Sequence, residues 1–154
     1  MTFEYITGTA LAALFASLAA VAVTWFLNRA AQRRDAKAEI LRAIARHLDR
    51  LWNYSTFHSE VRTAGIANPT TFNGDMAPFK PPVTGLLTEI IGAAVYLSSR
   101  ARIASDEVRR LISEAEVPHD TRSALADWQQ EATALASVGE RVAKWDAKSR
   151  RLPS

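Results

Sequence analysis

Residues 5–27 read YITGTALAALFASLAAVAVTWFL, an uncharged and mostly apolar run that decides how the rest of the chain is interpreted. As an α-helix rising ~1.5 Å per residue, this run is roughly 34 Å long. That length covers the ~30 Å hydrocarbon core of a bilayer. Its hydroxyl side chains can return hydrogen bonds to carbonyls one turn back, and aromatic residues stand at both ends, as in an interfacial belt. The run predicts an N-terminal transmembrane helix.

A cleaved signal peptide is the alternative interpretation of this run. Small residues recur near positions 16–22 and could form a cleavage site. However, the first five residues, MTFEY, contain no Lys or Arg, whereas a signal peptide begins with a basic region. The apolar run is also longer than the roughly 7–15 apolar residues of such signals. An uncleaved anchor is therefore expected.

The orientation of the anchor follows from the bases that flank it. Nothing basic precedes the run except the terminal amine, whereas Arg29, Arg33, Arg34 and Lys37 follow it closely. The positive-inside rule then places the N-terminus outside and the C-terminal part in the cytoplasm, as a single-pass protein. Each of these bases adds ~1 kcal/mol of attraction to an anionic leaflet, so they either bind anionic lipid or only orient the anchor, as the flanking bases of most anchors do.

Small residues recur at every fourth position within the apolar run, at Gly8, Ala12, Ala16 and Ala20. Such a stripe lets two membrane helices approach closely, so it predicts packing against another membrane protein or a second copy. A composition this rich in Ala also produces such a stripe without any packing role.

The composition outside the run is that of an ordinary domain. The 154 residues are 48% hydrophobic, with 19 Lys and Arg against 16 Asp and Glu for a formal charge of +3, and only one of these charged side chains precedes residue 28. The chain contains no Cys, which excludes disulfides, Cys-ligated zinc and iron–sulfur clusters.

Residues 28–64 are predicted to form a basic juxtamembrane stalk helix that continues from the membrane helix without Gly or Pro. A single apolar stripe at spacings of three and four runs along it, with Trp52 as its last member and Arg42, Arg46 and Arg50 on a different face. The stripe consists of Ile40, Leu41, Ile44, Leu48, Leu51 and Trp52. Trp52 and Trp128 are both expected in the core.

Residues 65–83 contain two Gly and four Pro, so no helix is expected there. The apolar side chains of this loop include Phe72, Met76 and Phe79. They either pin the loop to the helices or form a partner-binding loop.

Residues 84–154 are predicted to complete a small helical bundle that ends in a frayed basic tail at Arg150 and Arg151. One helix is expected over 84–104, a second opening at an N-cap Ser105, and a third over about 119–148. No segment alternates with period two, so the fold class is all-α, although the same spacings would suit coiled-coil pairing between chains.

No motif or residue cluster predicts catalysis, a metal or a cofactor. Nucleotide-binding, hydrolase, zinc-protease and EF-hand motifs are absent, and His47 and His58 are three helical turns apart, too far to share one metal. Arg100, Arg102, Arg109 and Arg110 cluster without any nucleic-acid recognition motif. We expect neither an enzyme nor a nucleic-acid-binding protein, and no small-molecule substrate is identified.

The sequence therefore predicts a membrane-anchored interaction or accessory subunit that binds protein partners or self-assembles through its transmembrane and cytoplasmic helices. The alternative is a small membrane-active effector of the phage, toxin or defence type, with a cytoplasmic sensing domain. The anchor-plus-bundle layout suits both, because a fold does not select a function.

Overall fold

The computed structural model describes residues 3–63, 80–116 and 124–153, with side chains throughout except at 3–14, 58, 61–63 and 124–127. This part of the chain is all-helical, which confirms the predicted fold class at that level. The helices are α1 (Phe3–Thr63), α2 (Val83–Ala94), α3 (Ser99–Ala115) and α4 (Ala124–Lys144).

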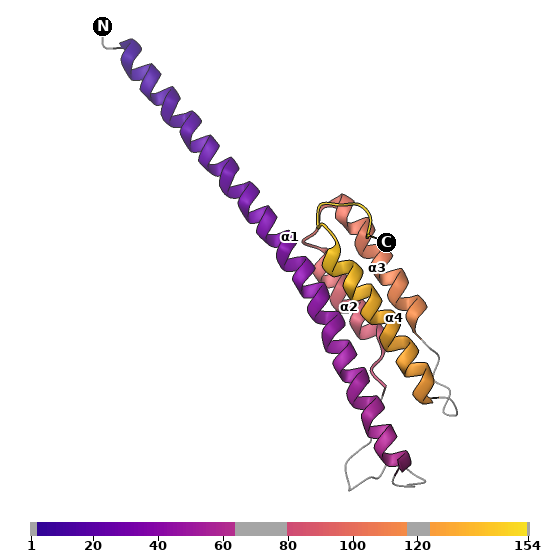
Figure 1. Ribbon diagram of the computed structural model, residues 1–154. Coiled ribbons are helices and arrows are strands. Elements are labelled where there is room, and N and C mark those ends of the chain that lie inside the picture. Colours follow the sequence, from indigo (N-terminus) through magenta and orange to yellow (C-terminus); the bar gives the residue numbers. More distant parts are fainter. Residues whose placement is uncertain (1–2, 64–79, 117–123, 154) are drawn as a thin grey trace.

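The second half of α1 packs with the other three helices into an up-and-down bundle, and its first half projects beyond them (Figure 1). Helix α1 contacts α2 and α4, and α3 contacts the same two helices from the opposite corner. Because neighbouring helices run antiparallel, the α2–α3 turn and the chain after α4 lie at the end from which α1 projects (Figure 1).

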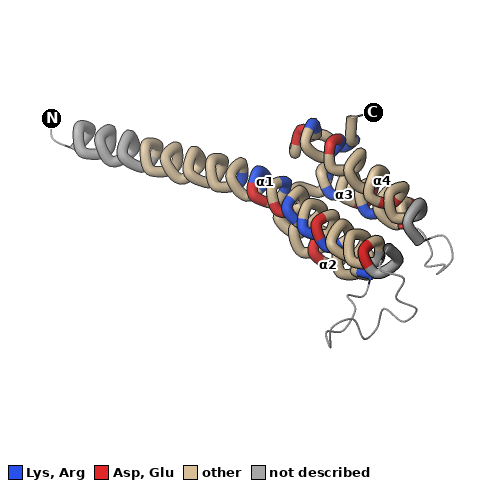
Figure 2. The backbone as a smooth tube through the Cα atoms, turned by 60° about the horizontal axis from the view of Figure 1, so that its bottom comes forward, with Lys and Arg blue, Asp and Glu red and all other residues tan. Residues whose placement is uncertain are grey.

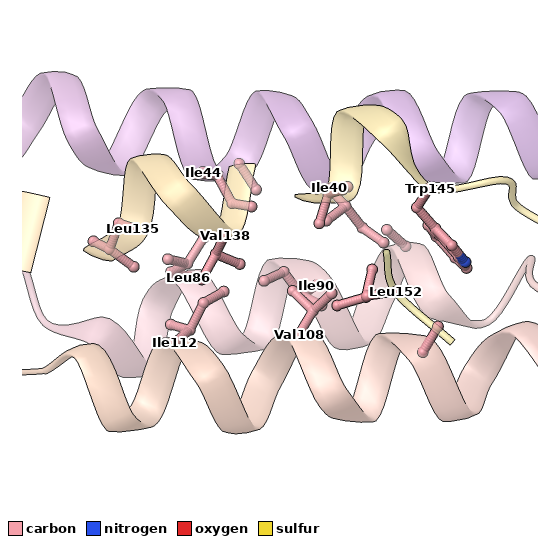
Figure 3. Close-up of a cluster of buried hydrophobic side chains, with 14 of the residues drawn as sticks. Ile40, Ile44, Leu86, Ile90, Val108, Ile112, Leu135, Val138, Trp145 and Leu152 are labelled. Carbon is pink, nitrogen blue, oxygen red and sulfur yellow. The ribbon is translucent and has the colours of Figure 1, made fainter. Parts of the chain in front are cut away.

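The core is an apolar cluster to which all four helices contribute (Figure 3). Ile40 on α1, Ile90 on α2 and Val108 on α3 are fully enclosed, as is Val142 on α4. Enclosing a side chain of this size contributes about 1.5–3 kcal/mol to folding, so these layers account for much of the stability of the bundle. Among the side chains of α1 that the structure describes, Ala36 is the first that is buried, and residues 15–29 are all exposed.

The structure corrects the predicted helix over 84–104. Helix α2 ends at Ala94, and Ser98 caps α3 by accepting a hydrogen bond from the Ala101 amide at 3.4 Å. Ser105, predicted as an N-cap, is buried inside α3. The acids after Ser105 resemble a first helical turn, but they are mid-helix residues that form ion pairs with Arg109 and Arg141.

The expectation that both Trp52 and Trp128 are core residues is half wrong. Trp128 is buried and its ring lies 4.0 Å from that of Tyr54, whereas Trp52 is 71% exposed. Successive helical residues are ~100° apart, so Trp52 is turned away from the core that its neighbour Leu51 enters. The two helices that flank α1 cover only part of the width of its apolar stripe, so the rest of the stripe stays exposed.

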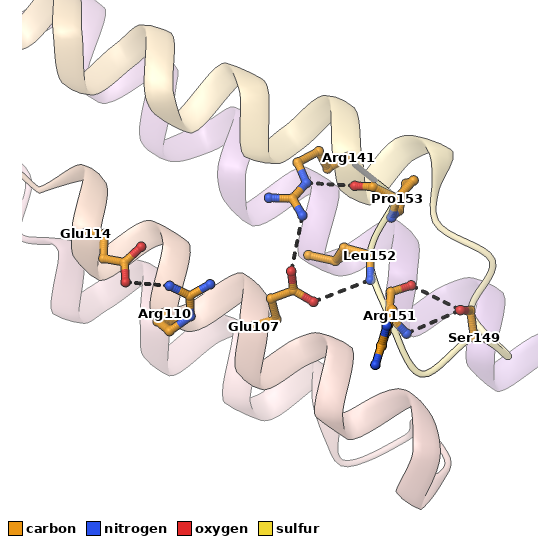
Figure 4. A network of polar contacts seen from close by, with 8 residues as sticks. All are labelled: Glu107, Arg110, Glu114, Arg141, Ser149, Arg151, Leu152 and Pro153. Carbon is orange, nitrogen blue, oxygen red and sulfur yellow. Dashed lines mark hydrogen bonds and ion pairs between the residues drawn. The ribbon is translucent and has the colours of Figure 1, made fainter.

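The predicted frayed tail is also wrong, because the segment 145–153 folds back over α3 and α4 (Figure 4). Trp145 and Leu152 are buried. Arg141 Nε donates to the Pro153 carbonyl at 2.8 Å, and Arg141 Nη2 meets Glu107 Oε1 at 3.1 Å. We call residues 145–153 the C-terminal segment.

Among the residues whose side chains the structure describes, we find no helix with the length and apolar character needed to cross a bilayer. The predicted transmembrane helix over 5–27 is therefore not shown by the structure. Its first part, residues 5–14, lies outside the described side chains.

Candidate functional site

The most unusual feature of the molecule is the apolar part of α1 that projects from the bundle. Phe15, Val21 and Leu27 expose 67%, 66% and 65% of their surface. Other large side chains between them are exposed as well, namely Leu18, Val23, Trp25 and Phe26. No charged residue occurs between Phe15 and Asn28, and Figure 2 shows this stretch of α1 in tan. No other described element covers this surface.

Aromatic and basic side chains meet where the apolar part ends. The rings of Trp25 and Phe26 lie 5.1 Å apart in an edge-to-face arrangement, and the Arg29 guanidinium lies 5.1 Å from the centre of the Trp25 ring. Thr24 Oγ1 donates to the Ala20 carbonyl at 2.8 Å, which satisfies its hydroxyl within the helix. An aromatic pair followed by a cation is typical of the boundary between apolar and aqueous phases.

The predicted small-residue stripe is only partly described. Ala16 and Ala20 are exposed on the projecting part of α1, and Gly8 and Ala12 lie outside the described side chains. The predicted loop residues Phe72, Met76 and Phe79 also lie outside the described part of the chain.

The four basic residues that the sequence predicts to face lipid headgroups lie where the projecting part of α1 meets the bundle. Arg29 and Arg34 are exposed, and Arg33 and Lys37 are half-buried. Lys37 Nζ donates to the carbonyls of Ala143 and Trp145 at 2.8 and 2.7 Å, where α4 ends. A cation there satisfies carbonyls that the helix leaves unpaired and complements its dipole, so it fixes the C-terminal segment against α1.

Bases on the flank of the bundle are instead neutralised by acids. Arg42 and Arg46 contact Glu39 at 2.6 and 2.9 Å, and Arg46 reaches Glu89 on α2 at 2.6 Å. The hydrogen bonds from Arg46 and then Arg42 lower the pKa of the exposed Glu39 carboxyl. The sequence contained the signal for the Glu39–Arg42 pair in its three-residue spacing.

A buried polar cluster lies toward the opposite end of the bundle. The Glu131 carboxylate is fully buried and contacts Lys80 Nζ at 2.6 Å. His47 is buried nearby, its Nε2 has no hydrogen-bond partner among the described residues, and burial lowers its pKa. Sequence reasoning missed this cluster, although Glu131 stands within the apolar seam between Trp128 and Leu135.

Exposed apolar side chains lie on the outer face of α2 and just after its end. Ile91, Val95 and Tyr96 are exposed. Ile91 and Val95 line a cavity of about 430 Å³ together with Arg102 and Arg109. Buried Leu86 and Ile90 form the inner face of the same helix. Helix α2 therefore has one side that faces the core and one side that faces solvent, as expected for an outer helix of a small bundle.

Within the described residues, no group of three or more His, Asp or Glu side chains converges as a metal site would require. We found no matching family model, no similar curated protein and no similar solved structure. The functional interpretation therefore rests on the residues themselves.

Proposed function

We propose that this chain is a single-pass, membrane-anchored helical protein that presents its bundle on the cytoplasmic side, where the bundle binds protein partners or a second copy. One observation carries the proposal: the described part of α1 before Arg29 exposes large apolar side chains that no other described element covers. Leaving such surface in water costs ~25 cal/mol per Å², so it calls for an apolar environment.

The distribution of these side chains supports lipid as that environment. At ~100° per residue, the large apolar residues between Phe15 and Leu27 occupy more than half of the helix circumference. A single partner helix covers one strip of that surface, whereas a bilayer covers all of it. Together with residues 5–14, which are also uncharged, the run has the length of a membrane-spanning helix.

The direction of the anchor is supported by the bases at its end. Arg29, Arg33, Arg34 and Lys37 all follow the apolar run, and the bundle lies on their side of it. The positive-inside rule then assigns the bundle to the cytoplasm.

Partner binding is supported by the outer face of α2. Ile91, Val95 and Tyr96 expose apolar surface on the folded bundle, and the centre of an interface is more apolar than the rest of a protein surface, with Tyr enriched there. The test is affinity capture of the full chain from membranes in mild detergent, comparing Val95→Arg with a control, Trp52→Arg, which changes an exposed apolar residue on α1. A partner lost from Val95→Arg alone supports the proposal, and capture that is equal in all three chains contradicts this assignment of the surface.

The effector alternative draws on the exposed Ala16 and Ala20, which permit close contact between anchors. It predicts that expression arrests growth and that Ala16→Leu relieves the arrest. The control is Ala22→Leu, which points ~120° away from Ala16 and ~160° away from Ala20 around the helix and so faces away from this part of the stripe. Harmless expression of the unmodified chain contradicts the effector function.

A further inference from the structure

We propose that a cavity between α1 and the C-terminal segment binds a phosphate group at the membrane-proximal end of the bundle. The cavity has a volume of about 320 Å³. Its polar lining contains four bases and one acid, and a tryptophan also lines it. The residues concerned are Arg33, Arg34, Lys37, Trp145, Asp146 and Lys148.

The bases of this cavity have no carboxylate partner among the described residues. Within the part of the chain that the structure describes, ion pairs involve none of Arg33, Arg34, Lys37 and Lys148. Arg33 Nε is enclosed and has no hydrogen-bond partner among the described residues. The Asp146 carboxylate accepts a hydrogen bond from the Lys148 backbone amide at 3.0 Å, so it orders the segment locally.

Most bases elsewhere on the bundle form ion pairs with acidic side chains. Ion pairs hold Arg42, Arg46, Lys80, Arg109, Arg110, Arg141 and Lys144. Other bases with described side chains lack an ion pair. Apart from Arg50, they belong to the end of the bundle from which α1 projects, which we call the membrane-proximal end. They are Arg29, Arg33, Arg34, Lys37, Arg100, Arg102, Lys148, Arg150 and Arg151.

Helix capping accounts for two of these bases and not for the others: Lys37 Nζ donates to carbonyls at the end of α4, and Arg102 Nη2 donates to the Val95 carbonyl just after α2 at 3.2 Å. Arg100 and Arg102 stand in the first turn of α3, which has no acidic residue, and bases at a helix N-terminus oppose the helix dipole. Bases there and in the C-terminal segment are also separate in sequence from the positive-inside flank after residue 27. Their convergence arises only from the folding of the bundle.

A phosphate group is the ligand that this lining fits. Guanidinium groups form paired hydrogen bonds with phosphate oxygens, and a lysine adds a compact charge beside them. A phosphate group carries up to two negative charges, so it offsets more of the four cations than one carboxylate would.

The position of the cavity indicates where the phosphate can come from. Arg33 follows Leu27 by six residues, or ~9 Å along the helix axis. The headgroup layer extends roughly 5–7 Å beyond the hydrocarbon on each side, and an arginine side chain spans the remaining distance. The phosphate of an anionic lipid is therefore within reach, and this source rests on the membrane anchoring proposed above. A soluble phosphate compound is the other source.

The test measures binding to the full chain in neutral-detergent micelles by titration calorimetry. One arm adds phosphatidic acid to the micelles, and the other adds inorganic pyrophosphate to the solution. Lys148→Gln removes a cavity base that lies outside the anchor flank. Lys144→Gln is the matched control, because Lys144 is 70% exposed, does not line the cavity and reaches Glu140 at 4.0 Å.

We expect at least one probe to bind, with Lys148→Gln weakening binding about fivefold, as expected for the loss of one base near an anionic group, and Lys144→Gln by less than about twofold. Binding of phosphatidic acid alone identifies a lipid headgroup, and binding of pyrophosphate identifies a soluble source. Absence of binding by both probes, or equal losses in the two variants, overturns the site. Membrane attachment is measured separately by alkaline extraction, which Lys148→Gln leaves unchanged, so either proposal can fail without the other.

Discussion

At the scale of single residues, burial in the fold perturbs the imidazole of His47. Burial lowers its pKa, Glu131 opposes that effect, and Arg50 and Lys80 reinforce it. The unfolded chain therefore binds a proton to this imidazole at a higher pH than the folded chain does.

The sign of the pH dependence follows from this difference. Stability from His47 is fully present above its unfolded pKa of ~6.5 and decreases as the pH falls from there toward the lower folded pKa. We expect the free energy of unfolding, measured by denaturant titration at pH 7 and pH 5, to fall less in His47→Gln than in the unmodified chain. An equal decrease in both chains would show that His47 does not control stability in this range.

The buried Lys80–Glu131 pair makes a second prediction at this scale. Removing one partner of a buried ion pair typically costs about 3–5 kcal/mol, because the other charge remains in the core. We expect Lys80→Met to lower the free energy of unfolding by about 3 kcal/mol and Lys80→Met/Glu131→Met to restore part of that loss. If the double variant is less stable than Lys80→Met, the penalty does not come from a stranded carboxylate.

At the scale of elements, the apolar stripe of α1 was predictable from its spacing, but its width was not. Ile40, Ile44 and Leu51 enter the core as the spacing predicts, whereas Trp52 does not. Periodicity identifies the direction of the core, and the number of neighbouring helices determines how much of the stripe they cover.

This difference predicts a large loss of stability for substitution at one of two adjacent residues and a small change at the other. Leu51→Ala should lower the free energy of unfolding by about 2–5 kcal/mol, because it leaves a cavity in a filled core. Trp52→Ala should change it by about 0.5 kcal/mol or less, as at other exposed sites. Chemical denaturation of both variants checks this, and a large loss in Trp52→Ala would contradict the assignment of its exposed position.

The division between α2 and α3 was not predictable, because no Gly or Pro marks it and Ser105 offers a stronger cap signal than Ser98. The structure distinguishes the two serines by their partners, since Ser98 caps α3 and the buried Ser105 hydroxyl has no described partner. Ser98→Ala should cost about 1 kcal/mol by loss of the cap. Ser105→Ala should be neutral or stabilising, since it removes a buried hydroxyl that has no described hydrogen-bond partner. Thermal unfolding that ranks them in the reverse order would contradict this division.

At the scale of the whole molecule, the sequence locates the apolar run and its flanking bases because both are continuous in the chain. It does not predict that Arg100, Arg102 and the C-terminal segment join those bases, because that depends on antiparallel packing of helices far apart in sequence. The mistaken frayed tail has the same origin, since the contacts that hold Leu152 and Pro153 come from α3 and α4.

The central claim is that lipid covers the projecting part of α1, and alkaline extraction of membranes tests it most directly. An arginine near the centre of a membrane helix costs about 2.5–3.5 kcal/mol, so Leu18→Arg with Val21→Arg should release the chain into the supernatant. Ile91→Arg with Val95→Arg is the matched control, because Val95 is exposed to 62% and Val21 to 66%. We predict that the unmodified chain and this control stay in the membrane pellet; release of the unmodified chain, or full retention of the Leu18 and Val21 variant, would contradict the account.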